Sequence, residues 1–283
     1  MFTFHTHTEF CDGKSTINEF CNEAIRLNYN KIGFTSHAPV PFENEWSLDF
    51  DKLLNYSKAI DDAKLHYSDR IDIYKGLEVD FIPSYTIAFN QFKRIIKADY
   101  FIGSIHLVEN PSNGELWFID GEKKKYFETL KQVFNGDAKI AVSQFFEQTR
   151  MMIAREKPDV IGHLDKVKMN SNHELFSEND SWYINEVQKT LEAIVEAGSI
   201  VEINSRGIYR GKYHETFPSP LIIKECIRLN IPLTLASDAH HISDLDNGFN
   251  LSLKTAIDCN VKEIAIFEND KWVLKPLFLF IKN

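Results

Sequence analysis

Residues 2–13 read FTFHTHTEFCDG, a short β-rich run that ends in two histidines one residue apart. Side chains alternate between the two faces of a strand, so His5 and His7 should project to the same side of a sheet. Asp12 follows five residues after His7, directly before a glycine. Imidazole is a common metal ligand, and two ligands on one rigid element lower the entropy cost of forming a metal site. The stretch therefore predicts one edge of a metal site at the carboxyl end of a first strand.

Apolar runs and amphipathic segments alternate along the rest of the chain. The runs predicted as strands are residues 2–6, 31–36, 71–77, 100–105, 159–162, 200–203 and 232–236, with a further β-like run at 263–267. The segments with helical spacing of apolar residues are 16–28, 49–67, 84–97, 122–134, 138–156, 180–197, 219–229 and 247–259. Such alternation is typical of an α/β protein whose parallel strands are joined by right-handed crossovers. Seven repeats without an obvious reversal of strand order favour a closed TIM-like barrel, and an open parallel sheet is the alternative.

Length and composition are those of one globular domain. The 283 residues are close to the roughly 250 of a typical barrel, and 43% of them are hydrophobic. No repeat, linker or change of composition divides the chain, so residues 1–283 are predicted to form a single domain. The net charge of −9 argues against nucleic acid or an anionic membrane as a partner, because both attract basic surfaces. An anionic substrate would need a local positive source, such as metal ions.

The cysteines and the chain start favour a cytoplasmic protein. Cys11, Cys21, Cys226 and Cys259 show no C-x-x-C spacing and resemble reduced thiols more than a disulfide framework. The first residues lack the basic and apolar regions of a secretion signal, and no apolar run reaches about 18 residues. We therefore expect a soluble protein. Nothing in the sequence indicates its oligomeric state.

Metal-ligand residues recur where the predicted strands end. The first strand ends in His5 and His7. The second to fifth strands are followed by His37, Glu78, His106 and His163, and the seventh by the pair Asp238 and His240, while the sixth offers no ligand. In a barrel the carboxyl ends of all strands meet on one face, where barrel enzymes carry their chemistry. Each residue alone would suit a loop histidine, a helix cap or a turn aspartate. Their shared position favours a metal cluster.

The number of candidate ligands suggests more than one ion. With three or four protein ligands for each ion, and a carboxylate able to bridge, the set suits two or three divalent ions of zinc, manganese or iron. A multinuclear site of this kind generates hydroxide at neutral pH and clamps the oxygens of a phosphoryl group. The nine candidate ligands are His5, His7, Asp12, His37, Glu78, His106, His163, Asp238 and His240.

The motifs around these residues resemble a known set. H-T-H-T with Asp12, T-S-H-A-P, G-L-E-V-D, G-S-I-H, G-H-L-D and S-D-A-H look like those of the polymerase and histidinol phosphatase (PHP) superfamily. Their order over residues 5–240 is most similar to its histidinol-phosphatase branch. The resemblance implies a distorted (βα)7 TIM-like barrel with a trinuclear metal centre. It also implies hydrolysis of L-histidinol phosphate to L-histidinol and phosphate, a step of histidine biosynthesis.

The resemblance also implies how the ligands divide. His5, His7, Glu78 and Asp238 would hold a first metal, and Glu78, His106 and His163 a second, with Glu78 bridging. Asp12, His37 and His240 would hold a third. Some members of the superfamily have histidine where this chain has Asp12, which leaves the affinity and metal preference of the third site open.

We also predict a mechanism, a general acid and residues that bind the phosphate. A hydroxide bridging the metals would attack phosphorus, and the leaving alkoxide would need a proton. Asp238 or His240 is the first candidate for the general acid, with His106 or Asp165 as alternatives. Arg206, at the end of the sixth strand, suits bidentate contact with phosphate unless it is a solvated loop arginine. Lys166 is a second candidate for this contact.

Histidinol carries an ammonium and an imidazole, so its pocket should offer a carboxylate and an aromatic face. The loops after the second and fourth strands contain such residues, and the second of these loops is long enough to form a lid. These residues could equally pack the loops. They are Glu43, Trp46, Glu115 and Trp117.

Three other functions compete with this interpretation. A phosphoesterase that acts on another small phosphomonoester would use the same ligands. One that acts on nucleic-acid ends would need a basic groove with interleaved aromatic residues, which this acidic chain lacks. A structural or storage metal protein would coordinate each ion fully and would not need an arginine on an open face.

Overall fold

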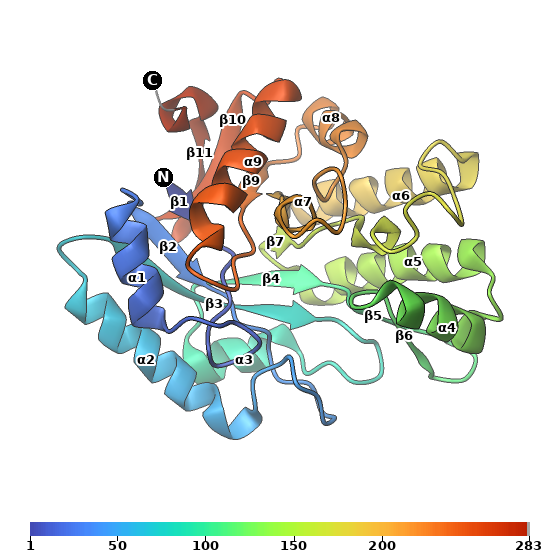
Figure 1. Ribbon diagram of the computed structural model, residues 1–283, viewed down its shortest axis with the longest axis horizontal. Helices are drawn as coiled ribbons and strands as arrows, with labels where there is room; N and C mark the ends of the chain where they lie inside the picture. Colours follow the sequence, from blue (N-terminus) through green and yellow to red (C-terminus); the bar gives the residue numbers. More distant parts are fainter. Residues whose placement is uncertain (282–283) are drawn as a thin grey trace.

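Seven parallel strands form the centre of the molecule (Figure 1). The computed structural model describes residues 1–281. The strands follow one another in the order β1-β2-β3-β4-β7-β8-β9, so each new strand is added beside the previous one. They are β1 (Phe2–Thr3), β2 (Lys31–Phe34), β3 (Asp72–Asp80), β4 (Tyr100–Ser104), β7 (Val160–Ile161), β8 (Ile200–Asn204) and β9 (Leu233–Ala236).

The sheet closes between its two edge strands through a short contact. Thr6, just past β1, forms an isolated parallel bridge with Ala239, just past β9. The His7 amide donates to the Ala239 carbonyl at 2.8 Å. The seven-stranded sheet is therefore nearly closed, which confirms the prediction of a distorted TIM-like barrel in a single α/β domain. In the alternative, an open sheet, the two edge strands would not contact each other.

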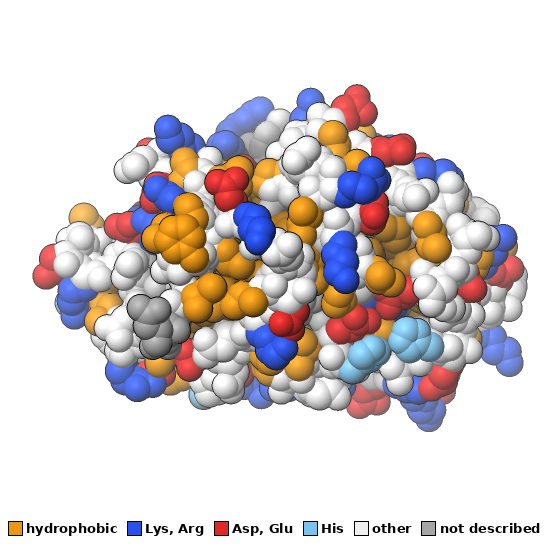
Figure 2. Space-filling view, turned by 90° about the horizontal axis from the view of Figure 1, so that it is seen from above, with side chains coloured by type: hydrophobic (Ala, Val, Ile, Leu, Met, Phe, Trp, Pro, Cys, Tyr) orange, Lys and Arg blue, Asp and Glu red, His pale blue; other side chains and the backbone are white. Residues whose placement is uncertain are grey.

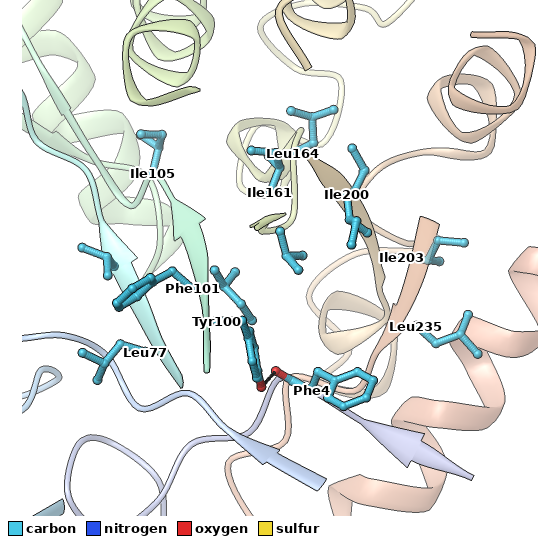
Figure 3. Packing of buried hydrophobic residues seen from close by; sticks show 14 of the residues in the cluster. Phe4, Leu77, Tyr100, Phe101, Ile105, Ile161, Leu164, Ile200, Ile203 and Leu235 are labelled. Atoms are coloured by element: carbon cyan, nitrogen blue, oxygen red, sulfur yellow. Dashed lines mark hydrogen bonds between the residues drawn. The ribbon is translucent and has the colours of Figure 1, made fainter. Parts of the chain in front are cut away.

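The first strand is shorter than the predicted span 2–6. The Phe4 carbonyl accepts a hydrogen bond from the Tyr100 hydroxyl at 2.6 Å, and not from the backbone of a neighbouring strand (Figure 3). The Tyr100 ring crosses the barrel interior and leaves no room opposite it: a Cβ on Gly33 would lie 2.0 Å from the Tyr100 hydroxyl. Position 33 therefore requires a glycine because the Tyr100 side chain lies against the backbone of β2, and not because of an unusual backbone conformation.

Eight longer helices surround the strands within the described chain (Figure 1). The first begins at a capping box, in which Thr16 and Glu19 satisfy each other's backbone amides. The predicted helix 84–97 begins only at residue 89, because Thr86 binds the Ile82 amide in a preceding turn. The helices are α1 (Ile17–Arg26), α2 (Leu53–His66), α3 (Phe89–Ile96), α4 (Lys123–Phe134), α5 (Ala138–Glu156), α6 (Ser181–Ala197), α8 (Pro220–Arg228) and α9 (Asp244–Asp258).

Four short helical segments and two antiparallel hairpins complete the described chain. The stretch after His106, predicted as an irregular loop or lid, instead forms the hairpin β5 (Leu107–Glu109) and β6 (Leu116–Phe118). The run 263–267 is confirmed as β10 (Glu263–Glu268), and it pairs with β11 (Lys271–Pro276), which was not predicted. The turn α7 (Arg206–Tyr209) follows β8 directly, and single 3-10 turns lie at Phe50–Lys52, Lys166–Lys168 and Leu277–Phe280.

The β10–β11 hairpin covers the amino end of the barrel. Its Trp272 ring packs 5.2 Å from Phe4 and 5.5 Å from Tyr100, centroid to centroid. Aliphatic residues of the strands belong to the same buried core, and several of them, such as Leu77 and Leu235, point from the strands away from the barrel centre (Figure 3). The carboxyl ends of the strands are thus the open end. No helix within residues 1–281 combines the length and apolarity needed to cross a membrane.

Candidate metal centre

The carboxyl ends of six of the barrel strands carry the residues of the site. His5 and His7 follow β1, His37 follows β2, His106 follows β4, His163 follows β7, and Asp238 and His240 follow β9. Glu78 lies inside β3, which continues two residues beyond it and past the predicted end at 77. Asp12 comes from the loop before α1. Apart from Asp12, which is partly exposed, these side chains are buried.

A first group of ligand atoms converges from β1, β3 and β9. The Nε2 atoms of His5 and His7 lie 3.0 Å apart, and each is 3.2 Å from Oε2 of Glu78. Oδ1 of Asp238 lies 3.4 Å from His7 Nε2 and 3.7 Å from His5 Nε2. Ligand atoms about 2.1 Å from one tetrahedral ion are about 3.4 Å apart, so this spacing fits a single cation.

Glu78 faces two groups at once. Its Oε1 lies 3.0 Å from His163 Nε2 and 3.8 Å from His106 Nε2, while Oε2 faces the first group. The two histidine Nε2 atoms are 3.2 Å apart. The Ser104 hydroxyl donates to Oε1 at 2.6 Å and helps to hold the carboxylate. A carboxylate with one oxygen toward each group can bridge two ions.

A third group lies around Asp12. Its Oδ2 is 3.2 Å from His240 Nε2, and its Oδ1 is 3.9 Å from His37 Nε2 and 3.8 Å from His7 Nδ1. His37 also turns its Nδ1 toward Glu78 Oε2, at 3.2 Å. The structure thus brings all nine predicted residues together, but His7 and His37 each lie between two groups. The division of ligands among three ions stays a prediction.

The donor set of this cluster fits divalent cations. Oδ1 of Asp12 and Oδ1 of Asp238 are buried, and neither accepts a hydrogen bond from the described residues. A buried carboxylate oxygen without a partner is costly, and a cation would satisfy it. Several imidazole nitrogens and carboxylate oxygens face one another within 4.8 Å. These clusters are consistent with a multi-metal site.

The pKa values of the buried histidines and carboxylates in this cluster are shifted by burial and by the charges of their neighbours. Burial alone would lower the pKa of His5, but Glu202, Asp238 and Glu78 outweigh it and raise the pKa to about 10. Burial and the neighbouring His7 lower the pKa of His240 to about 4. Burial would raise the pKa of Asp238, but His5 and other cations hold it well below its usual value. Neither Asp238 nor His240 therefore holds a proton at neutral pH, which weakens both as predicted general acids.

A cavity of about 120 Å³ adjoins the cluster. It shares His163 and Asp238 with the metal-ligand groups, and its remaining wall is strongly basic. Arg210 and Lys212 form no ion pair within the described chain, although the whole chain has a net charge of −9. An anion would be attracted to this point of an otherwise acidic protein. The four cationic residues of the wall are Lys166, Arg206, Arg210 and Lys212.

The two predicted phosphate contacts lie in this wall. Arg206 opens the short turn α7, and its Nη1 lies 3.0 Å from the Asp238 carbonyl and 2.7 Å from His240 Nδ1. Lys166 Nζ is 2.6 Å from Oδ2 of Asp120, which also lines the cavity. Arg206 is therefore not a solvated loop arginine.

Four other predicted residues lie outside the cavity wall. Trp117 is fully buried: its indole donates to the Tyr126 carbonyl, and its ring packs on aromatic residues of α4. Glu115 is exposed in the β5–β6 turn, where it binds Asn113. Glu43 is exposed on its loop. Asp165 is buried beside Lys168, at 2.8 Å, and accepts from the Ser219 amide.

Several residues near the site were missed by the sequence reasoning. Asp80 accepts from the His106 amide at 2.9 Å, Glu202 binds His5, and Asp120 enters the cavity. A charged residue inside the apolar run 200–203 was the available signal for Glu202. Trp46, one of the aromatic candidates, does lie beside the cluster, with its ring 5.2 Å from that of His37.

Known proteins resemble this chain over most of its length. The model of the PHP domain family matches residues 3–206. A histidinol-phosphatase of Bacillus subtilis is 25% identical over 268 residues, which cover 88% of this chain and 97% of the relative. The crystal structure of a histidinol phosphate phosphatase from Lactococcus lactis, bound to zinc, L-histidinol and phosphate, superposes with a TM-score of 0.68 at 20% identity. It covers 96% of this chain and 98% of its own. A candidate histidinol phosphatase from Listeria monocytogenes superposes with a TM-score of 0.75 at 23% identity, covering 88% and 99%.

Metal binding should stabilise the fold measurably. Zinc or manganese at a free concentration about 100-fold above its Kd should add about 2.7 kcal/mol and raise the Tm of the chelator-stripped protein by about 5–10 °C. His7→Ala should lose most of this rise, because His7 faces two ligand groups. His66→Ala, an exposed histidine at the end of α2, is the matched control and should keep it. An unchanged Tm of the wild-type chain on adding either metal would contradict the metal site.

Proposed function

Because this chain is a metal-dependent phosphoesterase of the PHP domain family, we propose that its substrate is L-histidinol phosphate, which it hydrolyses to L-histidinol and phosphate. The observation that carries the proposal is the basic cavity that opens onto the metal-ligand cluster. His163 and Asp238 belong to both, so a phosphoryl group held by the cavity cations would lie against the cluster. The near full-length similarity to histidinol phosphatases supports this choice of substrate.

The reaction exchanges one phosphorus–oxygen bond for another. Water supplies the new oxygen on phosphorus, the bond to the alcohol oxygen breaks, and that oxygen takes up a proton. Divalent ions held by the nine residues would lower the pKa of a water and neutralise the phosphoryl oxygens. Arg206 would orient the phosphate with its planar guanidinium, and Lys166 would add a second positive charge.

Two of the proposed proton donors have a raised pKa: burial raises the pKa of Asp165 to about 6, and the pKa of His106 is raised as well. Burial and Lys166 act to lower that pKa, but Asp80 and Glu78 outweigh them and raise it. Asp165 lies outside the cavity wall and is held by Lys168. We therefore favour His106 over Asp165, Asp238 and His240 as the proton donor, and the divalent ions would then be held by the other eight residues during that step.

The alcohol part of the substrate needs a different environment from the phosphate. Asp120 offers the cavity a carboxylate for the substrate ammonium, and Trp46 offers an aromatic edge beside His37. We propose these two residues in place of Glu43, Glu115 and Trp117, whose positions were described above.

A different small phosphomonoester is the alternative substrate, since the same cations and ligands would bind any phosphate. Nucleic-acid ends are less favoured. The face in Figure 2 mixes basic and acidic side chains and shows no continuous basic stripe.

The four cysteines are free thiols, which supports a cytoplasmic location for the proposed reaction.

A substrate panel tests the proposed function. The manganese- or zinc-loaded chain should hydrolyse L-histidinol phosphate with a kcat/KM on the order of 100-fold or more above p-nitrophenyl phosphate and a 5′-phosphorylated oligonucleotide. Exhaustive chelation should abolish the activity, and metal add-back should restore it. Equal turnover of all substrates would refute the histidinol specificity, and activity that survives chelation would refute the metal mechanism.

Arg206 should act mainly on substrate binding. Arg206→Ala removes a charge-assisted contact worth about 1.5–3 kcal/mol, so KM for L-histidinol phosphate should rise about 10- to 100-fold. Arg228→Ala, which removes an exposed arginine paired with Glu225 on α8, should leave KM unchanged. A normal KM in the Arg206 variant would remove this residue from the phosphate site.

A further inference from the structure

The carboxylate of Glu202 lies buried behind the metal-ligand cluster. Glu202 stands in the middle of β8, between apolar neighbours, and its side chain has no exposed surface. A buried carboxylate is stable only when its oxygens accept hydrogen bonds. The partners of Glu202 are therefore informative about its role.

The two oxygens of Glu202 face different partners. Oε2 lies 2.7 Å from Nδ1 of His5. Oε1 accepts from the His163 amide at 2.9 Å and from the Asn204 side-chain amide at 2.8 Å. One carboxylate thus contacts residues of β1, β8 and the end of β7.

The contact with His5 determines which nitrogen of that ring can bind a metal. A carboxylate only accepts, so Nδ1 of His5 must carry the proton and donate it. In the neutral ring that would bind a metal, Nε2 then carries the free lone pair, and it faces His7, Glu78 and Asp238. A hydrogen bond from the remote nitrogen is the usual way in which a protein orients a metal-ligating histidine.

Asn204 extends the same network to a second ligand. Its side-chain amide also lies 3.1 Å from Oδ2 of Asp238, while Oδ1 of Asp238 faces the histidines without a hydrogen bond. Asp238 and His163 have φ angles of 52° and 22°, in a region that residues other than glycine rarely adopt. Hydrogen bonds from the Glu202–Asn204 pair reach both strained residues.

We propose that Glu202 is a positioning residue that fixes the tautomer of His5 and, through Asn204 and the His163 amide, the orientation of two further metal ligands. It touches neither substrate nor metal. The proposal rests on the metal-dependent function proposed above. It adds that ligands from three separate strands depend on one buried carboxylate.

Glu202→Gln tests the tautomer directly. If the glutamine oxygen stays opposite its two N–H donors, its NH₂ group faces His5 Nδ1 as a donor. Nδ1 must then accept, and the proton moves to Nε2, which can no longer bind a metal. Zinc affinity, measured by competition with a chelator, should fall about 10- to 100-fold. The metal content of the purified chain should fall by about one ion.

Glu109→Gln is the matched control. Glu109 is also a buried carboxylate, but it binds the backbone and hydroxyl of Ser84 and contacts no metal-ligand residue. Its variant should keep the zinc affinity and metal content of the wild type. Nitrogen-15 NMR of the zinc-loaded wild-type chain gives a test that needs no stable variant. The His5 ring, assigned with His5→Gln, should show a protonated Nδ1 and a zinc-bound Nε2.

The outcomes separate this proposal from the proposed function. Zinc bound to His5 through Nδ1, or equal zinc affinity of wild type and Glu202→Gln, would overturn the role of Glu202 while leaving the phosphatase intact. A wild-type chain that binds no zinc or manganese would instead refute the metal-dependent function. Loss of affinity in both Glu202→Gln and Glu109→Gln would also overturn the proposal, because the effect would then be general to buried carboxylates.

Discussion

The contact between Thr6 and Ala239 is the constraint on which the site depends. β1 and β9 lie at opposite ends of the strand order, and the parallel bridge with the His7–Ala239 hydrogen bond joins them. In an open sheet, His5 and His7 would be separated from Asp238 by the full width of the sheet. Barrel closure is therefore what creates the first group of ligand atoms.

Closure also places many polar groups in a buried interior, which is unfavourable unless they are compensated. Each ion moved into the protein interior costs several kcal/mol, and an unpaired one costs most. Glu78 is surrounded by five histidines, and both oxygens of Glu202 have hydrogen-bond partners. Oδ1 of Asp12 and Oδ1 of Asp238 are left without hydrogen bonds. The cluster is thus preorganised for cations, which would satisfy these two oxygens.

The sequence predicted the barrel and the convergence of the nine candidate ligands because both follow from local rules. Apolar runs mark the strands, and parallel strands place their ends on one face. Features that depend on distant partners were not predictable in this way. Trp117 was predicted to lie in a loop, but in the structure it belongs to the β5–β6 hairpin and is buried against α4. The partner β11, the role of Glu202 and the cavity position of Asp120 each need a contact that only the folded chain supplies.

We propose that Glu78 joins two ions of a multi-metal site built from the ends of six strands and one loop. Anomalous X-ray diffraction from crystals of the zinc- or manganese-loaded chain tests it most directly. We predict two or three anomalous peaks among the nine residues, with two of them within bonding distance of the two oxygens of Glu78. A single peak, or peaks that do not contact Glu78, would contradict the account.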